Sequence, residues 1–262
     1  MPSSGAPPCA AAALSLDGRN DELMPPDYSV VVPVFNEEGA AEALAREIAA
    51  AFEGAAIEIL FVDDASTDRT RARLTALKQT LPSLRVLTHA RNAGQSRAIR
   101  TGVLAALAPI VVTLDGDGQN APADAPRLAR RLRDSPLNLA LVGGQRLSRQ
   151  DSLAKRWASR IGNGVRSWLL HDGAADTGCG LKAFRREAFL RLPYFDHLHR
   201  FLPAMFLREG YELAFEPVSH RPRTSGASKY TNLGRLLASM PDLLGVMWLK
   251  SRARDPGAAE EV

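Results

Sequence analysis

The chain has 262 residues, 45% of them apolar and 24% charged, with a formal net charge of +4, values typical of one large soluble α/β domain rather than of a disordered or fibrous chain. The two cysteines, Cys9 and Cys179, lie far apart, which argues against a disulfide framework and favours a reducing compartment. No run of 18 apolar residues occurs, so no transmembrane helix is predicted.

The first 26 residues are rich in Ala, Pro, Ser and Gly. They lack the cationic start of a secretory signal, and Asp17, Asp21 and Glu22 stand where such a signal carries no acidic residue. We therefore expect residues 1–26 to form a disordered extension and residues 255–262 to form a flexible tail.

From residue 27 to residue 145, apolar runs alternate with stretches of helical spacing, the pattern of a mostly parallel sheet. Strands are expected at 29–34, 57–62, 84–87, 110–114 and 139–142, and helices at 38–52, 95–107 and 125–132. A further helix is expected after Ser66, which is a candidate N-cap. After residue 144 the alternation ends, and we expect loops, helices and short strands.

Acidic residues directly follow the predicted strand 110–114, in the segment Asp115-Gly116-Asp117-Gly118-Gln119. In open α/β sheets, ligands bind at the carboxyl ends of the strands. Two carboxylates at positions i and i+2 suit a hard divalent cation, and the glycines allow close approach of a phosphorylated ligand. A simple Asp-Gly turn is the alternative interpretation.

Two further strand ends carry Pro33-Val34-Phe35-Asn36-Glu37-Glu38 and Val62-Asp63-Asp64-Ala65-Ser66-Thr67-Asp68. In this order, the three segments resemble the family 2 inverting glycosyltransferases, and within them the polyprenyl-phosphate group that includes dolichol-phosphate mannosyltransferase. The resemblance covers about residues 28–249. It implies a single α/β domain of the GT-A type, Rossmann-like, at 27–232, with a nucleotide-sugar half at 27–145 and an acceptor half at 146–232.

The resemblance also implies a binding site for a UDP- or GDP-linked sugar with Mg²⁺ or Mn²⁺. Asp64 would accept an imino N–H of the base, and Phe35, where the family often has Tyr, would keep the stacking contact. Asp117 would be the principal metal ligand, with Asp115 and Gln119. The full nucleotide-sugar set is Pro33, Phe35, Glu37, Val62, Asp64, Asp115, Gly116, Asp117, Gln119 and Arg146. For Asp63 and Asp68 we favour capping and turn roles.

In the second half, the family's basic motifs are matched by Gly143-Gly144-Gln145-Arg146, by Lys155-Arg156, and by Arg223 with Lys229. Arg156, Arg223 and Lys229 would hold the acceptor phosphate. Asp176 resembles the acidic residue at the acceptor site, so Asp117, Asp176, Arg223 and Lys229 are the candidate catalytic residues. The loop Asn92-Ala93-Gly94 resembles a family loop that approaches phosphate, but a plain connection is equally compatible with it.

A phosphate acceptor needs no general base, because its second pKa is about 6 and it is largely ionised at pH 7. This argument, together with the resemblance, makes a polyprenyl phosphate the leading acceptor. The alternative is a hydroxyl of a glycan or lipid, with Asp176 as general base. A nucleotidyltransferase would show a Gly-rich basic loop after the first strand, which residues 33–38 lack. No nucleic-acid partner is expected, since aromatic residues are only 6% and are not interleaved with the basic runs.

Apolar residues recur at helical spacing between 233 and 249, flanked by Arg235, Lys250, Arg252 and Arg254. We expect residues 233–254 to form an amphipathic helix at an anionic membrane surface, with the protein peripheral on the cytoplasmic face of the inner membrane. Packing on the domain, or in a dimer interface, is the alternative. Cys179 is expected to be a buried, inert thiol, and the histidines to have structural or surface roles.

Overall fold

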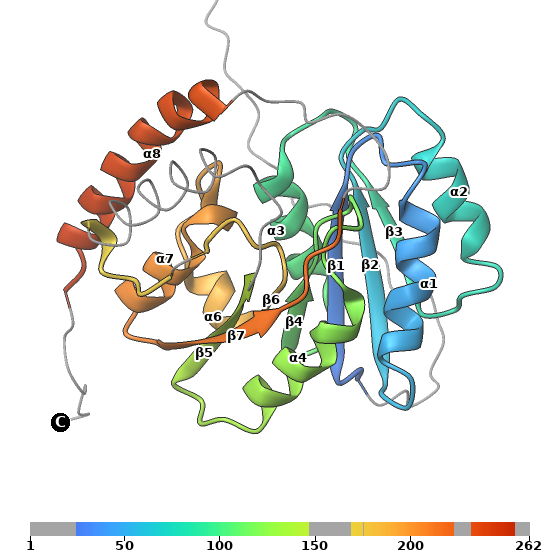
Figure 1. Ribbon diagram of the computed structural model, residues 1–262, viewed down its shortest axis with the longest axis horizontal. Helices are drawn as coiled ribbons and strands as arrows, with labels where there is room; N and C mark the ends of the chain where they lie inside the picture. Colours follow the sequence, from blue (N-terminus) through green and yellow to red (C-terminus); the bar gives the residue numbers. More distant parts are fainter. Residues whose placement is uncertain (1–24, 147–168, 175, 223–231, 255–262) are drawn as a thin grey trace, which may run out of the picture.

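The computed structural model describes residues 25–146, 169–174, 176–222 and 232–254, with the backbone alone for 232–239. These residues contain a seven-stranded sheet in the order β3-β2-β1-β4-β6-β5-β7 (Figure 1). Only β6 runs antiparallel to its neighbours in this sheet, so the mostly parallel sheet predicted from the sequence is confirmed. The strands are β1 (Tyr28–Val34), β2 (Ile57–Asp63), β3 (Leu84–Thr88), β4 (Ile110–Thr113), β5 (Leu139–Arg146), β6 (Lys182–Arg185) and β7 (Glu212–Val218).

Helices connect the strands and cover the sheet. They are α1 (Ala41–Ala51), α2 (Thr70–Leu77), α3 (Gln95–Ala105), α4 (Ala125–Arg133), α6 (Arg186–Arg191), α7 (Leu202–Arg208) and α8 (Asn232–Ser251), with the 3-10 turns η1 (Pro122–Asp124) and η2 (Leu198–Arg200). The expected N-cap at Ser66 is wrong. The α2 helix begins four residues later, because Ser66 Oγ instead accepts a hydrogen bond from the main-chain N–H of Asn36 at 2.9 Å.

Both faces of β1 are buried, which explains its continuous apolar run from Val30 to Val34. Val30 and Val32 point to a core shared with α1, α2 and α4, whereas Val31 points to a second core on the side of α3, α6 and α7. Alternate residues of one strand thus serve opposite layers, as the two-residue period of a strand requires.

The antiparallel strand β6 determines which segments meet at the carboxyl ends of the parallel strands. Its first residue, Lys182, pairs with Thr113 at the end of β4 and with Gly143 in β5. The segment that precedes β6 therefore arrives at the edge where β1, β2 and β4 end. The strands β5 and β7 run in the same direction as β4 and bring Arg146 and His220 to this edge.

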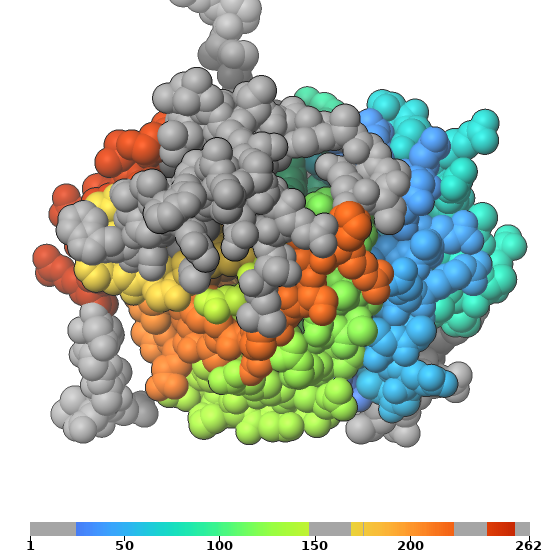
Figure 2. Space-filling view, in the orientation of Figure 1, coloured from blue at the N-terminus to red at the C-terminus, as the bar shows by residue number. Residues whose placement is uncertain are grey.

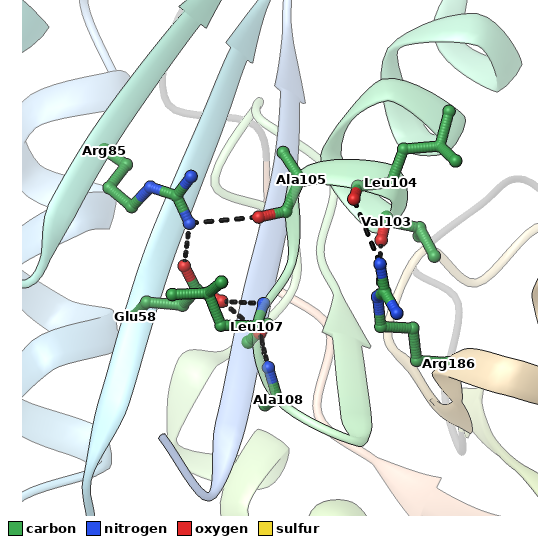
Figure 3. A network of polar contacts seen from close by, with 9 residues as sticks. Glu58, Arg85, Val103, Leu104, Ala105, Leu107, Ala108 and Arg186 are labelled. Carbon is green, nitrogen blue, oxygen red and sulfur yellow. Dashed lines mark hydrogen bonds and ion pairs between the residues drawn. The ribbon is translucent and has the colours of Figure 1, made fainter. Parts of the chain in front are cut away.

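At the opposite edge, a polar network ties the starts of the strands together (Figure 3). The buried carboxylate of Glu58 accepts hydrogen bonds from Ser29 Oγ and from Leu107 N, both at 2.5 Å, and is paired with Arg85. Arg85 also donates to the carbonyl oxygen of Ala105 at 3.0 Å. This network joins β1, β2 and β3 to the end of α3, at the amino ends of these strands.

The long helix α8 lies on the outside of the molecule, beside α7 (Figures 1 and 2). Leu243, Val246 and Met247 pack against the second core. Three other apolar residues of this helix are exposed: Met240 by 47%, Leu244 by 61% and Trp248 by 59%. No helix within the described ranges is both long enough and apolar enough to span a bilayer.

Candidate active site

A cavity of about 690 Å³ opens at the carboxyl edge of the sheet. It is lined by the ends of β1, β4 and β5, by the first turn of α3, and by residues from the segments before β6 and around η2. Nine residues of the predicted nucleotide-sugar set line it: Pro33, Phe35, Glu37, Asp64, Asp115, Gly116, Asp117, Gln119 and Arg146. Its volume is in the range of small-molecule binding sites.

Val62 is the one member of the predicted set that does not line this cavity. It is fully buried in the core on the α3 side, where a side chain added at Gly102 would meet it. Val62 lies inside β2, where helices cover both faces of the sheet, so its side chain packs in the core. We correct its expected position accordingly.

Asp115 is held on several sides at the end of β4. Its Oδ1 accepts a hydrogen bond from Gln95 Nε2 at 2.8 Å, and its main-chain N–H donates to Asn120 Oδ1 at 3.0 Å. A Cβ atom at Gly180 would overlap the Asp115 carboxylate, so any larger residue there would displace it. Gly116 is equally constrained, because its Cβ would lie 2.7 Å from the carbonyl oxygen of Pro33.

Negative charge is concentrated at this point of the cavity. Burial raises the pKa of the Asp115 carboxyl, and the neighbouring Asp117 raises it further, while Lys182, Gln95 and Arg146 act in the opposite direction. Asp117 Oδ1 accepts a hydrogen bond from the main-chain N–H of Gln119 at 3.1 Å. Two close carboxylates, one of them buried, are stabilised in their ionised form by a bound cation.

The donor set fits a divalent cation that is shared with a phosphorylated ligand. Among the described residues, no three His, Cys, Asp or Glu side chains gather into a metal site. Asp115 and Asp117 therefore supply two carboxylates at most, with the Gln119 side chain as a neutral oxygen donor. Mg²⁺ is commonly bound in this way, by one or two carboxylates together with substrate phosphates and water.

The Asp64 carboxylate organises the loop between β3 and α3. It accepts hydrogen bonds from the main-chain N–H groups of Ala93 at 2.9 Å and Gly94 at 2.8 Å, and it contacts His89 Nδ1 at 2.7 Å. His89 Nε2 in turn lies 2.9 Å from Thr101 Oγ1. Asp64 thus stands at the cavity in a fixed orientation, and its loop brings Asn92, Gly94 and Gln95 into the lining.

Asp63 and Asp68 have the local roles that the sequence indicated. Asp63 Oδ1 accepts a hydrogen bond from the main-chain N–H of Ser66 at 3.0 Å. Asp68 accepts hydrogen bonds from Thr70 and from the main-chain N–H of Glu38. These bonds shape the two loops beside the cavity.

Arg146 and Asp176 form a nearly buried, two-pronged ion pair. Arg146 Nε donates to Asp176 Oδ2 at 2.5 Å, and its Nη2 donates to Oδ1 at 2.7 Å. Burial opposes the charge of Arg146, but these bonds outweigh it and raise the pKa of the guanidinium. Because both carboxylate oxygens of Asp176 face a permanent cation, use of Asp176 as a proton acceptor requires this pair to break.

Four basic residues of the cavity lining, Lys182, His199, Arg200 and His220, are not among the site residues predicted from the sequence. Lys182 is buried, its Nζ donates to the carbonyl oxygens of Thr177 and Cys179, and burial lowers its pKa. The only available signal was their place in the second half, beside segments that matched family motifs. Cys179 is fully buried, as expected, and burial raises its pKa.

Three predicted residues, Arg156, Arg223 and Lys229, lie outside the described residues. Arg146 is the last described residue before 147–168. The main-chain N–H of Arg221, two residues before Arg223, donates to the carbonyl oxygen of Gln119 at 2.9 Å.

Comparison with protein families gives a match to "Glycosyl transferase family 2" over residues 29–192. The matched region contains all three acidic segments, the strands β2 to β6 and all of β1 except its first residue. The chain belongs to glycosyl transferase family 2. The predicted family and enzyme class are therefore confirmed.

Relatives with named activities are similar over most of the chain. The dodecaprenyl-phosphate galacturonate synthase of Rhizobium johnstonii is 33% identical over 252 residues, which cover 92% of this chain and 72% of the relative. The undecaprenyl-phosphate 4-deoxy-4-formamido-L-arabinose transferases of Sodalis glossinidius and Pseudomonas aeruginosa are 37% and 38% identical. The matched region covers 66% and 64% of the length of these two relatives. The chain thus spans about two thirds of the length of these family members.

The fold is shared with a solved glycosyltransferase. The glucosyl-3-phosphoglycerate synthase of Mycobacterium tuberculosis, in complex with Mn²⁺, UDP and glucosyl-3-phosphoglycerate, superimposes with a TM-score of 0.65 at 19% identity. The match covers 88% of this chain and 82% of the other. This likeness confirms the expected GT-A type α/β fold.

Proposed function

We propose that this family 2 member transfers a sugar, with inversion, from a nucleotide-diphosphate sugar to a polyprenyl phosphate at a membrane surface. The names of the relatives are the main support for this proposal. They act on different sugars, galacturonate and a formamido-arabinose, yet each is named for a polyprenyl-phosphate acceptor. Similarity across 82–92% of this chain therefore supports the acceptor class and leaves the sugar open.

The donor fits the carboxyl edge of the sheet. Asp64 is fixed by its loop and has a carboxylate that can accept the imino N–H of uracil or guanine. Phe35 lines the same cavity and offers a stacking surface. The diphosphate would lie beside Asp115 and Asp117, with Mg²⁺ or Mn²⁺ held by these residues and Gln119. When bound, the cation neutralises charge on the departing diphosphate.

The acceptor phosphate would attack the anomeric carbon in line with the bond to the nucleotide diphosphate, which breaks as the new carbon–oxygen bond forms. The phosphate oxygen is already ionised, so no protein base is needed. The ion pair between Arg146 and Asp176 agrees with this, because it occupies the best-placed carboxylate. Arg156, Arg223 and Lys229 are proposed to hold the acceptor phosphate, as cations suited to it.

The alternative, transfer to a hydroxyl with Asp176 as general base, predicts a different pH behaviour. The rate would then depend steeply on pH, and Asp176→Asn would remove that dependence. Under the phosphate-acceptor proposal, Asp176→Asn weakens the hold on Arg146 and lowers the rate without changing the shape of the pH profile.

Attachment to the membrane is proposed to use α8. The exposed residues Met240, Leu244 and Trp248 follow each other at intervals of four, so they form one apolar stripe along the helix. Trp248 carries the guanidinium of Arg252 over its ring, 6.0 Å from the centroid. Apolar residues with Trp and adjoining basic charge are suited to the interface of an anionic membrane, here proposed to be the cytoplasmic face of the inner membrane.

The structure changes one part of that expectation. The side chain of Lys250 is turned inward, where its Nζ donates to the carbonyl oxygen of Leu170, and burial lowers its pKa. Arg252 and Arg254 are exposed. The proposed basic contribution of this end of α8 therefore comes from the two arginines.

The proposal is tested with a panel of UDP- and GDP-sugars, each incubated with Mg²⁺ or Mn²⁺ and with or without undecaprenyl phosphate. We expect release of nucleoside diphosphate from one of the sugars to rise strongly when the lipid is added. Release that depends on a glycan or lipid hydroxyl instead, with undecaprenyl phosphate inert, would contradict the proposed acceptor.

A further inference from the structure

Ser96, in the first turn of α3, and His199, in η2, are joined across the cavity wall although 103 residues separate them. Ser96 Oγ lies 2.7 Å from His199 Nδ1, and the main-chain N–H of His199 donates to the same oxygen at 3.2 Å. Ser96 is 3% exposed, whereas His199 lines the cavity. The contact therefore fixes the imidazole from its inner side.

These two contacts determine where the imidazole proton lies. Ser96 Oγ accepts the main-chain N–H of His199, and in the described part of the chain its hydroxyl has no acceptor other than Nδ1. The hydroxyl proton is thus donated to Nδ1, and the ring carries its own proton on Nε2. Burial lowers the pKa of His199 well below its usual value, and the nearby cations Arg200 and Lys182 lower it further, so the ring is neutral.

His199 Nε2 has no hydrogen-bond partner among the described residues. Its position relative to the donor site follows from α3, because consecutive residues of that helix bridge two walls of the cavity. Gln95 binds the Asp115 carboxylate, and Ser96 binds His199. His199 is thus tied to the residue that follows Gln95, the partner of Asp115, beside which the diphosphate is proposed to lie.

We propose that His199, oriented by Ser96, donates a hydrogen bond from Nε2 to a hydroxyl group of the sugar in the donor nucleotide, and so contributes to the choice of sugar. This inference rests on the proposed function. A neutral, directional donor suits a hydroxyl oxygen, whereas the diphosphate is matched by the divalent cation and by basic side chains. A site built to bind a hydroxyl discriminates against sugars that lack it or place it elsewhere.

The test compares binding of a nucleotide with and without its sugar. Dissociation constants in the presence of Mn²⁺ are measured by calorimetry for UDP, GDP, UDP-glucose, UDP-galacturonate and GDP-mannose. The proteins are the wild type, His199→Ala, His199→Gln, Ser96→Ala and, as a matched control, His197→Ala. His197 is two residues away, pairs with Asp242 at 2.8 Å, and does not line the cavity.

The readout is the ratio of the Kd of the best-bound nucleotide sugar to the Kd of its nucleoside diphosphate. We expect His199→Ala to raise this ratio about three- to tenfold, the usual effect of one neutral hydrogen bond, with the Kd of the nucleoside diphosphate unchanged. His199→Gln, which keeps an N–H donor at similar reach, is expected to stay close to the wild type. Ser96→Ala is expected to lie between them, and His197→Ala to leave the ratio unchanged.

Two results would overturn the inference and leave the proposed function intact: an unchanged ratio in His199→Ala, or equal weakening of both ligands. If His199→Ala does not fold, an unchanged ratio in folded Ser96→Ala counts against the inference in the same way. Failure of the wild type to bind any of the five nucleotides would instead contradict the proposed function itself.

Discussion

Asp115 and Asp117 are held very differently, although only one glycine separates them. Asp115 is enclosed by Gln95, Asn120 and Gly180, so a change there disturbs several neighbours. Asp117 accepts one main-chain hydrogen bond, from Gln119. Asp117 is therefore the better residue for testing the metal without disturbing the fold.

Asp117→Asn removes the charge but keeps an oxygen that can accept the Gln119 N–H. We expect sugar transfer to fall by about a hundredfold or more, because several kcal/mol of charge stabilisation depend on the cation. Excess EDTA is expected to have the same effect on the wild type. Asp134→Asn, at an exposed aspartate, is the control, and circular dichroism checks the fold. Normal turnover by Asp117→Asn would contradict the metal assignment.

His199 also gives a prediction for stability against pH. Its pKa in the folded protein is well below 6.5, whereas in the unfolded chain it is about 6.5. As the pH falls through 6.5, the unfolded state binds more protons than the folded state, so the protein loses stability. When the pH is lowered from 7.5 to 5.5, we expect the free energy of unfolding of the wild type to fall by about 1 kcal/mol more than that of His199→Gln. Urea unfolding at the two pH values measures both. Equal losses would show that His199 is not held neutral.

Among the contacts between elements, the network around Glu58 is expected to contribute to stability but not to activity. The carboxylate of Glu58 is buried and joins four chain segments at the edge of the sheet opposite to the cavity. Glu58→Ala leaves Arg85 and two N–H or O–H donors without their acceptor. We expect a loss of about 3 kcal/mol, the lower end for a broken buried ion pair since Arg85 is partly exposed.

Thermal unfolding measures this loss as a fall in Tm of roughly 6–12 °C. Glu53→Ala, at an exposed residue five positions earlier, is the control and is expected to leave the Tm unchanged. Transfer activity per folded molecule is expected to stay the same in both variants at low temperature. A loss of activity without a loss of stability would place Glu58 in a functional role that the geometry does not indicate.

The exposed stripe of α8 is tested by substituting Met240, Leu244 and Trp248 together with Gln. The wild type is expected to co-sediment with phosphatidylglycerol liposomes, less so as salt rises, and weakly with phosphatidylcholine liposomes. The triple variant is expected to lose this binding while its nucleotide-sugar affinity is unchanged, because the stripe faces away from the core.

The matched control replaces Leu104, Leu107 and Leu137 with Gln. These leucines are exposed by 54%, 63% and 78% and belong to α3 and to the segments that lead into β4 and β5, not to α8. This control variant is expected to bind liposomes as the wild type does. If the wild type stays in solution with anionic liposomes at low salt, the role of α8 at the membrane is wrong.

For the whole molecule, the sequence predicts the first half well because its signals are local. Parallel strands buried on both faces are continuous apolar runs such as 30–32, and each acidic segment directly follows one of them. The positions of Asp64, Asp115 and Asp117 at one edge follow from parallel topology alone. The structure confirms that they line one cavity.

The second half was less predictable because its contacts are distant in sequence. The pairing of Ser96 with His199 spans 103 residues, and no local spacing indicates it. The antiparallel insertion of β6 between β4 and β5, which brings Lys182 to the site, also has no pattern of its own. Val62 is a different case. The resemblance suggested that it is a site residue, but its position inside a strand covered on both faces makes it a core residue.

In the proposed reaction, the sugar alone moves to a phosphate, and the nucleoside diphosphate is the leaving group. The most direct measurement is mass spectrometry of the lipid and nucleotide products formed from undecaprenyl phosphate and the nucleotide sugar selected from the panel. We predict equal amounts of nucleoside diphosphate and of a lipid that carries one phosphate and one sugar, with both lowered about a hundredfold or more in Asp117→Asn. A lipid diphosphate with release of nucleoside monophosphate, or nucleotide release without any sugar-bearing lipid, would contradict this reaction.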